Sequence, residues 1–210
     1  ERRKGKWHQP PSTLQQEASR KLGMGASKTM QVAQKLYEGI DLGGETVGLI
    51  TYMRTDGVQM SQESVSSIRD VIQSSYGPRF VPDAPREYKT RAKNAQEAHE
   101  AIRPTDATRS PKEMAGYLDR DQARLYELVW KRAVACQMAS AELDQTAIVL
   151  DAADKRTALR ANGSIIAFEG VLKLYQEDRD DPAADGEASD DRLLPSMKEG
   201  EPLARDGVKP

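Results

Sequence analysis

The chain has 210 residues, of which 30% are charged and 5% are aromatic, and its formal net charge is −2. This composition predicts a soluble protein of one large or two small domains, and no apolar run approaches the roughly 20 residues that span a bilayer.

The chain has a single cysteine, Cys136, so it cannot form an internal disulfide, and we expect this residue to be buried in a helix. One cysteine and two histidines are too few ligands for a Cys/His zinc site. No apolar segment follows the basic N-terminus, so we expect no signal peptide and a cytoplasmic location. Because the chain starts without methionine, we expect an excised part of a longer protein.

Charge is distributed unevenly along the chain. Residues 1–104 contain sixteen Lys and Arg against twelve Asp and Glu, whereas residues 177–191 contain eight acidic residues and one Arg. A mildly basic N-terminal half is compatible with nucleic acid as a partner. The acidic run has the composition of a solvated loop. A metal site there is disfavoured, because Pro and Ala interrupt the run and no apolar strand would hold the carboxylates in place.

Capping and stop signals predict two helices near the N-terminus. Ser12 and Gln15 fit a capping box, and the helix that they start should end at Gly23. Ser27 is expected to cap a second helix, whose apolar stripe at helical spacing ends at Gly39.

A β-strand is predicted over residues 46–53, and it leads into the most informative pair of side chains. Tyr52 and Arg54 are two positions apart, so in a strand they would project from one face and meet one ligand together. A fixed cation favours the phenolate form of a neighbouring tyrosine and also binds phosphate. The alternative, a packed ring beside a solvated charge, is the common arrangement for these residue types.

Three further helices are expected after this strand. Ser61 should cap the first of them, which ends at Gly77, and residues 77–93 form a proline-punctuated, extended connection. The Ser-Pro pair at 110–111 starts a short helix. Residues 119–138 form the longest helix, with a broad apolar face.

Residues after about 140 have a different pattern, in which short apolar runs alternate with turn signals. Strands are predicted over residues 146–150, 156–160 and 165–168, with Asn162 and Gly163 as a turn. The fold class that follows is α+β, with a mainly helical, winged-helix-like domain followed by part of an antiparallel β domain.

Three segments together resemble one family. They are residues 12–19 (STLQQEAS), 50–56 (ITYMRTD) and 94–104 (NAQEAHEAIRP). In this order and spacing they are similar to the bacterial DNA topoisomerase I family of type IA topoisomerases, and the similarity covers nearly the whole chain. It is weakest in the acidic run and over residues 1–11, which lack the family's Pro-aromatic-Thr lead, and Gly57 stands where many members have Ser.

The resemblance implies a reaction and its partners. Type IA enzymes cut one strand of negatively supercoiled DNA by transesterification, in which a tyrosine becomes linked to the 5′-phosphate and a 3′-hydroxyl is released. Another strand passes through the gap, and the hydroxyl reverses the attack without ATP. The partners are therefore a single-stranded segment of DNA and the remaining domains of the same enzyme. The full-length enzyme requires Mg²⁺, which a toprim domain binds, so we expect the Mg²⁺ ligands to be outside this chain.

The same resemblance implies roles for individual residues. Tyr52 matches the nucleophile, Arg54 the arginine that holds the scissile phosphate, and His99 a histidine that hydrogen-bonds this phosphate. An arginine fork and a histidine donor suit a phosphodiester that gathers negative charge during transfer. The residues matched to DNA contacts are Ser12, Gln15, Thr51, Thr55, Asp56, Glu100 and Arg103.

The implied domain order divides the chain into three parts. Residues 1–18 form a hinge or arch segment, residues 19–138 the catalytic-tyrosine domain, and residues 139–210 a β-rich arch segment with an acidic loop at 177–191. We expect this chain to be inactive alone. Two other function classes remain: a non-catalytic, winged-helix-like DNA-binding module and a structural domain without a nucleic-acid role. A 5′-phosphotyrosyl adduct distinguishes the enzyme from the first, and salt-dependent DNA binding excludes the second.

Overall fold

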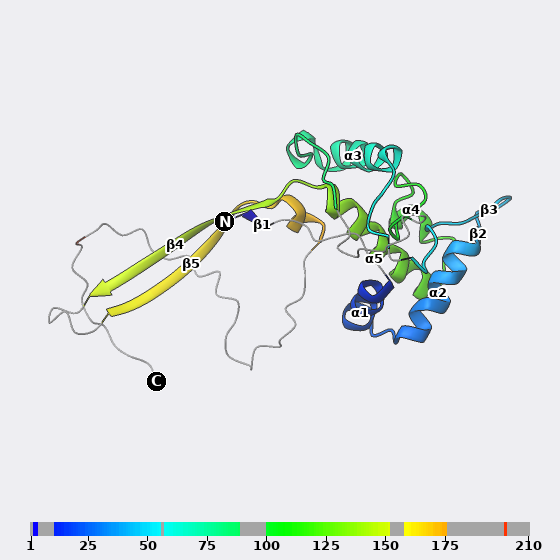
Figure 1. Ribbon diagram of the computed structural model, residues 1–210, viewed down its shortest axis with the longest axis horizontal. Coiled ribbons are helices and arrows are strands. Elements are labelled where there is room, and N and C mark those ends of the chain that lie inside the picture. Colours follow the sequence, from blue (N-terminus) through cyan, green and yellow to red (C-terminus); the bar gives the residue numbers. More distant parts are fainter. Residues whose placement is uncertain are drawn as a thin grey trace.

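The computed structural model describes residues 2–3, 11–55, 57–88, 100–151, 158–175 and 200. This described part consists of a helical body and a long antiparallel hairpin that projects from it (Figure 1). Helices and antiparallel strands occur in one chain, so the predicted α+β class is confirmed. None of the helices within the described ranges is long and apolar enough to cross a membrane.

Helix α1 spans Pro11–Leu22 and begins earlier than its predicted cap. Ser12 is therefore its second residue, and the predicted capping box with Gln15 is wrong. The fixed φ of a proline suits the first helical position, which explains the earlier start. The predicted end is confirmed, because Gly23 follows the last helical residue with a positive φ of 66°.

Helix α2 spans Ala26–Glu38, and its N-cap is Gly25, not the predicted Ser27. The Thr29 N–H closes the first helical bond to the Gly25 carbonyl at 2.9 Å, which sets the start two residues earlier. Gly39 ends the helix as predicted, and its N–H donates to the carbonyl of the last turn.

Helix α3 spans Gln62–Tyr76 and has both of its predicted ends. The Ser61 hydroxyl accepts a hydrogen bond from a backbone N–H of the first turn, which satisfies a group that has no partner within the helix. Gly77 follows the helix, and the chain then enters a short 3₁₀ turn, η1, over Pro78–Phe80.

Helix α4 begins after the predicted Ser110, and α5 begins within one residue of its predicted start. α4 spans Pro111–Met114 after Ser110, and α5 spans Arg120–Gln137 after Asp119. Each start is a reciprocal capping box, in which the N-cap side chain and the side chain three residues later accept from each other's backbone N–H groups.

The core of the helical body is built around α5. In Figure 1, α5 passes between α3 on one side and α1 with α2 on the other, and it contacts each of α1, α2, α3 and α4. Its last turns are buried on all sides over residues 132–138. Burial of each large aliphatic side chain contributes about 1.5–3 kcal/mol to folding. The fully buried members of this core include Leu14, Leu36, Ile72, Leu125 and Val129.

The predicted strand over residues 46–53 is mostly wrong. A two-residue strand, β3 (Thr46–Val47), pairs with β2 (Ile40–Asp41), the strand is then interrupted, and only a single β-bridge at Ile50 follows. The reason is close packing on the end of α2. A Cβ at Gly48 would lie 2.5 Å from the Tyr37 carbonyl oxygen, and the Leu49 N–H donates to the Leu36 carbonyl at 2.7 Å. At residues 48 and 49 these contacts with a helix interrupt the pairing that would continue β3.

The projecting hairpin consists of two 11-residue strands, β4 (Ala141–Asp151) and β5 (Ala158–Phe168), with β1 (Arg2–Arg3) at the edge of β4. The predicted turn at Asn162 and Gly163 is wrong, because both residues lie inside β5 opposite β4 residues. A continuous antiparallel ladder overrides the local turn preference of this pair.

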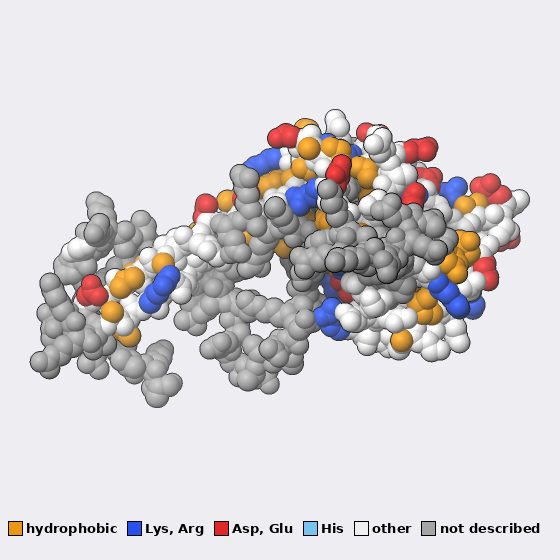
Figure 2. Space-filling view, viewed as in Figure 1, with side chains coloured by type: hydrophobic (Ala, Val, Ile, Leu, Met, Phe, Trp, Pro, Cys, Tyr) orange, Lys and Arg blue, Asp and Glu red, His pale blue; other side chains and the backbone are white. Residues whose placement is uncertain are grey.

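The far part of this hairpin exposes apolar side chains. Val149 is 59% exposed and Leu159 is 66% exposed. Apolar groups are visible on the projecting end in Figure 2. The two strands are therefore held together by their backbone ladder more than by a core of their own.

The root of the hairpin is fastened to the helical body by a buried polar cluster. After β5, the short turn η2 (Gly170–Lys173) leads to Tyr175, whose hydroxyl donates to Glu17 of α1 at 2.5 Å. Arg132 of α5 forms an ion pair with the same carboxylate, and both charged side chains are almost fully buried. Burial alone would lower the pKa of Arg132, but the neighbouring Glu17 and Tyr175 raise it. The cluster thus joins three distant parts of the chain through a charged contact.

Candidate active site

The segment that leads to Tyr52 pairs with the segment that follows His99 in the sequence. Residues 49–51 and 103–105 form a short antiparallel ladder around a bridge between Ile50 and Pro104. The Thr51 N–H donates to the Arg103 carbonyl at 2.9 Å, and the Thr105 N–H donates to the Leu49 carbonyl at 3.0 Å. Two motifs about fifty positions apart are therefore in direct contact.

The side chain of Thr51 adds two bonds to this contact. Its hydroxyl donates to the Ala101 carbonyl at 2.8 Å and accepts from the Arg103 N–H at 3.0 Å. On the other side, the Ala101 N–H donates to the Gln59 carbonyl at 2.8 Å. Residue 101 is thus held between the segment before Tyr52 and the segment after it.

Tyr52 is half-buried at the edge of the core. Its ring meets the Tyr37 ring edge-on, with 5.4 Å between the centroids and an interplanar angle of 66°. The prediction that Tyr52 and Arg54 share one face of a strand is wrong, because residues 52–54 form no strand. Met53 and Thr55 are buried, whereas Arg54 is exposed and forms no hydrogen bond or ion pair with another described residue. Its guanidinium is therefore accessible to an anion from solvent.

Glu100 and Arg103 form an ion pair within the motif over residues 94–104. Arg103 Nε donates to a Glu100 carboxylate oxygen at 2.6 Å, and Arg103 Nη1 donates to the Pro104 carbonyl at 2.9 Å. The Arg103 side chain is only 12% exposed. Most of its donors are therefore engaged inside the protein, and the pair stabilises the extended segment over residues 100–104.

The remaining predicted site residues are not brought together with this contact. His99 and Asp56 lie outside the described residues. The Thr55 hydroxyl accepts a hydrogen bond from the Gly57 N–H at 2.9 Å. Ser12 is exposed and Gln15 half-buried on α1, and no hydrogen bond joins either to the described part of the site. The DNA contacts predicted for these residues stay predictions.

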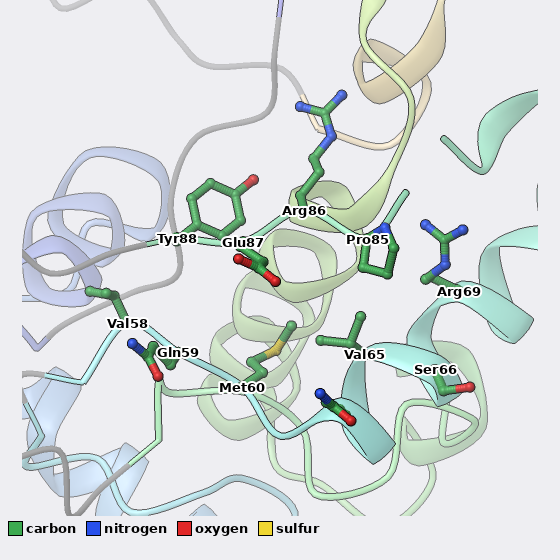
Figure 3. A pocket seen from close by; sticks show the side chains of 11 residues that line it. Val58, Gln59, Met60, Val65, Ser66, Arg69, Pro85, Arg86, Glu87 and Tyr88 are labelled. Atoms are coloured by element: carbon green, nitrogen blue, oxygen red, sulfur yellow. The ribbon is translucent and has the colours of Figure 1, made fainter. Parts of the chain in front are cut away.

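A cavity of about 570 Å³ lies beside the site and was not anticipated from the sequence. Figure 3 shows it between Met60 and Val65 on one side and Pro85 and Tyr88 on the other. The run 85–88 is fixed to the end of α5, where the Tyr88 hydroxyl donates to the Cys136 carbonyl at 2.8 Å. In the sequence, the proline-punctuated connection over residues 77–93 is the only feature that marks this wall of the cavity.

Cys136 is completely buried under this wall, as expected. Burial raises the pKa of its thiol to about 12, so the thiolate required of a nucleophile is not populated near neutral pH. Nor do the described ranges contain a group of three or more His, Cys, Asp or Glu side chains arranged to hold a metal ion.

Comparison with known proteins gives one consistent result. The model of the DNA topoisomerase family matches residues 1–210. DNA topoisomerase 1 of Rickettsia conorii is 52% identical over 205 residues, which are 96% of this chain and 26% of that protein. DNA topoisomerase 1 of Xylella fastidiosa is 55% identical over 197 residues, which are 92% of this chain and 24% of that protein.

A solved structure agrees with these relatives. Full-length topoisomerase I from Thermotoga maritima superposes with a TM-score of 0.74 at 36% identity, covering 85% of this chain and 28% of that one. The chain thus spans about a quarter of the length of the proteins it matches. Since the family match extends over every residue, the chain belongs to the DNA topoisomerase family.

Proposed function

We propose that this chain is the tyrosine-bearing part of a type IA topoisomerase that relaxes negatively supercoiled DNA in the bacterial cytoplasm. The observation that carries the proposal is the ladder between residues 49–51 and 103–105. The family's tyrosine and histidine motifs are far apart in the sequence, yet this ladder joins the start of the tyrosine motif to the end of the histidine motif. A shared catalytic site requires that juxtaposition.

The proposed reaction is the transfer of a phosphodiester to Tyr52. The phenolic oxygen attacks phosphorus, the O–H proton is lost, and the bond between phosphorus and the 3′-oxygen breaks. The released 3′-oxygen takes up a proton and becomes the hydroxyl that later reverses the step. The phosphotyrosyl ester keeps the energy of the broken bond, so religation needs no ATP.

Arg54 is proposed to hold the phosphate during this transfer. It is exposed, follows Tyr52 by two residues, and has no ion-pair partner within the described ranges. A guanidinium donates two parallel hydrogen bonds to phosphate oxygens, where negative charge accumulates in the transition state. His99 is proposed to donate a further hydrogen bond to the same group.

The chain is proposed to need other regions of the enzyme. The family generally depends on Mg²⁺, and the acidic side chains of the described ranges form no cluster that would bind it. Because the chain spans only about a quarter of the length of its relatives, we assign the Mg²⁺ ligands and the opposite wall of the site to other domains of the enzyme. The isolated chain is expected to be inactive on supercoiled plasmid, and efficient relaxation by it would contradict this part of the proposal.

The test uses the intact enzyme and a labelled single-stranded oligonucleotide. Wild type should form a covalent 5′-phosphotyrosyl adduct, and Tyr52→Phe should form none while its affinity for the oligonucleotide is retained. Tyr37→Phe is the matched control, because its ring packs against Tyr52 and the same hydroxyl is removed. It should form the adduct normally.

An adduct that survives Tyr52→Phe would refute the assignment of the nucleophile. DNA binding without an adduct in the wild type would instead favour the non-catalytic binding module.

A further inference from the structure

The antiparallel ladder beside the site ends in an unusual way at Thr51. Opposed residues of a regular antiparallel pair exchange two bonds, each from an N–H to the partner's carbonyl. The Thr51 N–H makes its bond to the Arg103 carbonyl at 2.9 Å. The returning bond from the Arg103 N–H goes to the Thr51 hydroxyl at 3.0 Å. The Thr51 hydroxyl therefore accepts the bond that the Thr51 main-chain carbonyl would accept in a longer ladder.

The same hydroxyl has a second partner. Its one proton is donated to the Ala101 carbonyl at 2.8 Å, so a single oxygen ties together the peptide groups on either side of Ile102. Phosphate oxygens only accept hydrogen bonds, and a hydroxyl has one proton to donate. Because that proton is already engaged, Thr51 is better suited to holding protein segments than to contacting DNA.

The opposite end of the ladder is closed in a comparable way. There the Leu49 N–H donates to the Leu36 carbonyl at the end of α2 instead of continuing the pairing. The paired region is therefore restricted to residues 49–51. Tyr52 is the first residue beyond the paired region, and the chain bends directly after it, at residues 53–54.

We propose that Thr51 is a positioning residue for the cleavage reaction. Its hydroxyl ends the ladder and fixes the direction in which the chain turns into Tyr52, and it thereby sets the place of the phenol relative to residues 100–103. This inference rests on the proposed function, in which Tyr52 is the nucleophile. Valine has nearly the same shape as threonine but neither donates nor accepts, so it would lose both bonds while filling the same space.

The experiment compares three variants of the intact enzyme. Thr51→Val removes both bonds, and Thr51→Ser keeps the hydroxyl. Thr105→Val is the matched control, since the Thr105 hydroxyl also donates across this contact, to the Gly48 carbonyl at 2.7 Å, but Thr105 lies at the other end of the ladder, where its N–H bonds to Leu49. The measurements are the single-turnover rate of covalent adduct formation, the Kd for the oligonucleotide and the thermal unfolding midpoint.

Thr51→Val should form the adduct about 10- to 100-fold more slowly, the range expected for a slightly misplaced catalytic group, with an unchanged Kd. Thr51→Ser should recover most of the rate. Thr105→Val should lower the unfolding midpoint about as much as Thr51→Val does, but should cleave at the wild-type rate.

If Thr51→Val cleaves at the normal rate and Tyr52→Phe abolishes the adduct, the inference about Thr51 fails but the proposed function stands. Equal rate losses in Thr51→Val and Thr105→Val also overturn it, because they indicate a general loss of structure. If Tyr52→Phe retains the adduct, or the wild type forms none, the proposed function fails and the inference fails with it.

Discussion

The helical body and the projecting hairpin are ordered by different forces. In the body, five helices surround a core with many fully buried side chains, and α5 is enclosed over residues 132–138. In the hairpin, β4 pairs with β5 from Glu142 to Asp151, yet Leu159 and Val149 remain more than half exposed. A two-stranded ribbon is only marginally stable by itself in water. The comparison teaches that the hairpin depends on its attachment to the body, and two predictions address that dependence before a third addresses the body alone.

The largest effect is expected at the cluster that joins the two regions. Glu17→Gln removes a buried negative charge and leaves Arg132, whose side chain is 6% exposed, without its counterion. Breaking one partner of a buried ion pair costs about 3–5 kcal/mol. The free energy of unfolding, measured by urea denaturation of the chain, should fall by that amount.

The control for this change is on α5 itself. Glu127 pairs with Lys131, and their side chains are 46% and 40% exposed. Glu127→Gln should change the free energy of unfolding by less than about 0.5 kcal/mol, because solvent screens an exposed pair. Similar losses in both variants would show that the buried cluster does not attach the hairpin root.

The second prediction compares one leucine from each region. Leu36→Ala empties a site that is 0% exposed in the body and should cost about 2–5 kcal/mol of unfolding free energy. Leu159→Ala, at a site that is 66% exposed in the hairpin, should stay within about 0.5 kcal/mol. Calorimetry of both variants measures the difference. A large loss from Leu159→Ala would mean that the hairpin is covered in solution and that the comparison is wrong.

The smallest effect concerns a local contact within the body. The Glu113 carboxylate accepts from the Ser110 hydroxyl at 2.7 Å and from the Ser110 N–H at 2.9 Å, and these bonds lower its pKa from the ordinary 4.5. The folded pKa lies below the unfolded one, so this stabilisation is complete above the unfolded pKa and is lost as the pH falls through the folded value. An NMR titration of the Glu113 carboxyl should give the lowered pKa.

Glu113→Gln serves as the reference for that titration, since glutamine keeps the capping geometry without a titrating group. The difference in stability between the two proteins should be constant above the unfolded pKa and should change only at lower pH. A titration of Glu113 at its ordinary pKa would contradict the assignment of the bonds.

The parts of the fold that follow from the sequence are those fixed by local chemistry. Ser61, Ser110 and Asp119 cap their helices because each side chain bonds a backbone N–H of the next turn. The predictions that failed concern residues whose main-chain partners are distant. Residues 48–51 bond to α2 and to residues 101–105, and Asn162 lies inside a ladder with β4. No local pattern contains those partners.

The same distinction applies to the candidate site. Tyr52 and Arg54 were identified from a motif, and their predicted strand geometry failed because residues 52–54 follow the end of a short ladder. The role of Thr51 requires knowledge of which peptide groups face it, so it is visible only in the folded chain. The likeness of whole motifs identified the family, whereas the arrangement within the site came from tertiary contacts.

The burial of Cys136 makes the thiol an internal reporter of opening. It is the only cysteine of the chain, it is completely enclosed, and its pKa is raised to about 12. An alkylating reagent can therefore reach it only when the protein around the end of α5 opens, as it would where the wall formed by residues 85–88 separates from the helix. The labelling rate, followed by mass spectrometry, measures how often that separation occurs, and bound DNA would change the rate if the separation belongs to the working cycle.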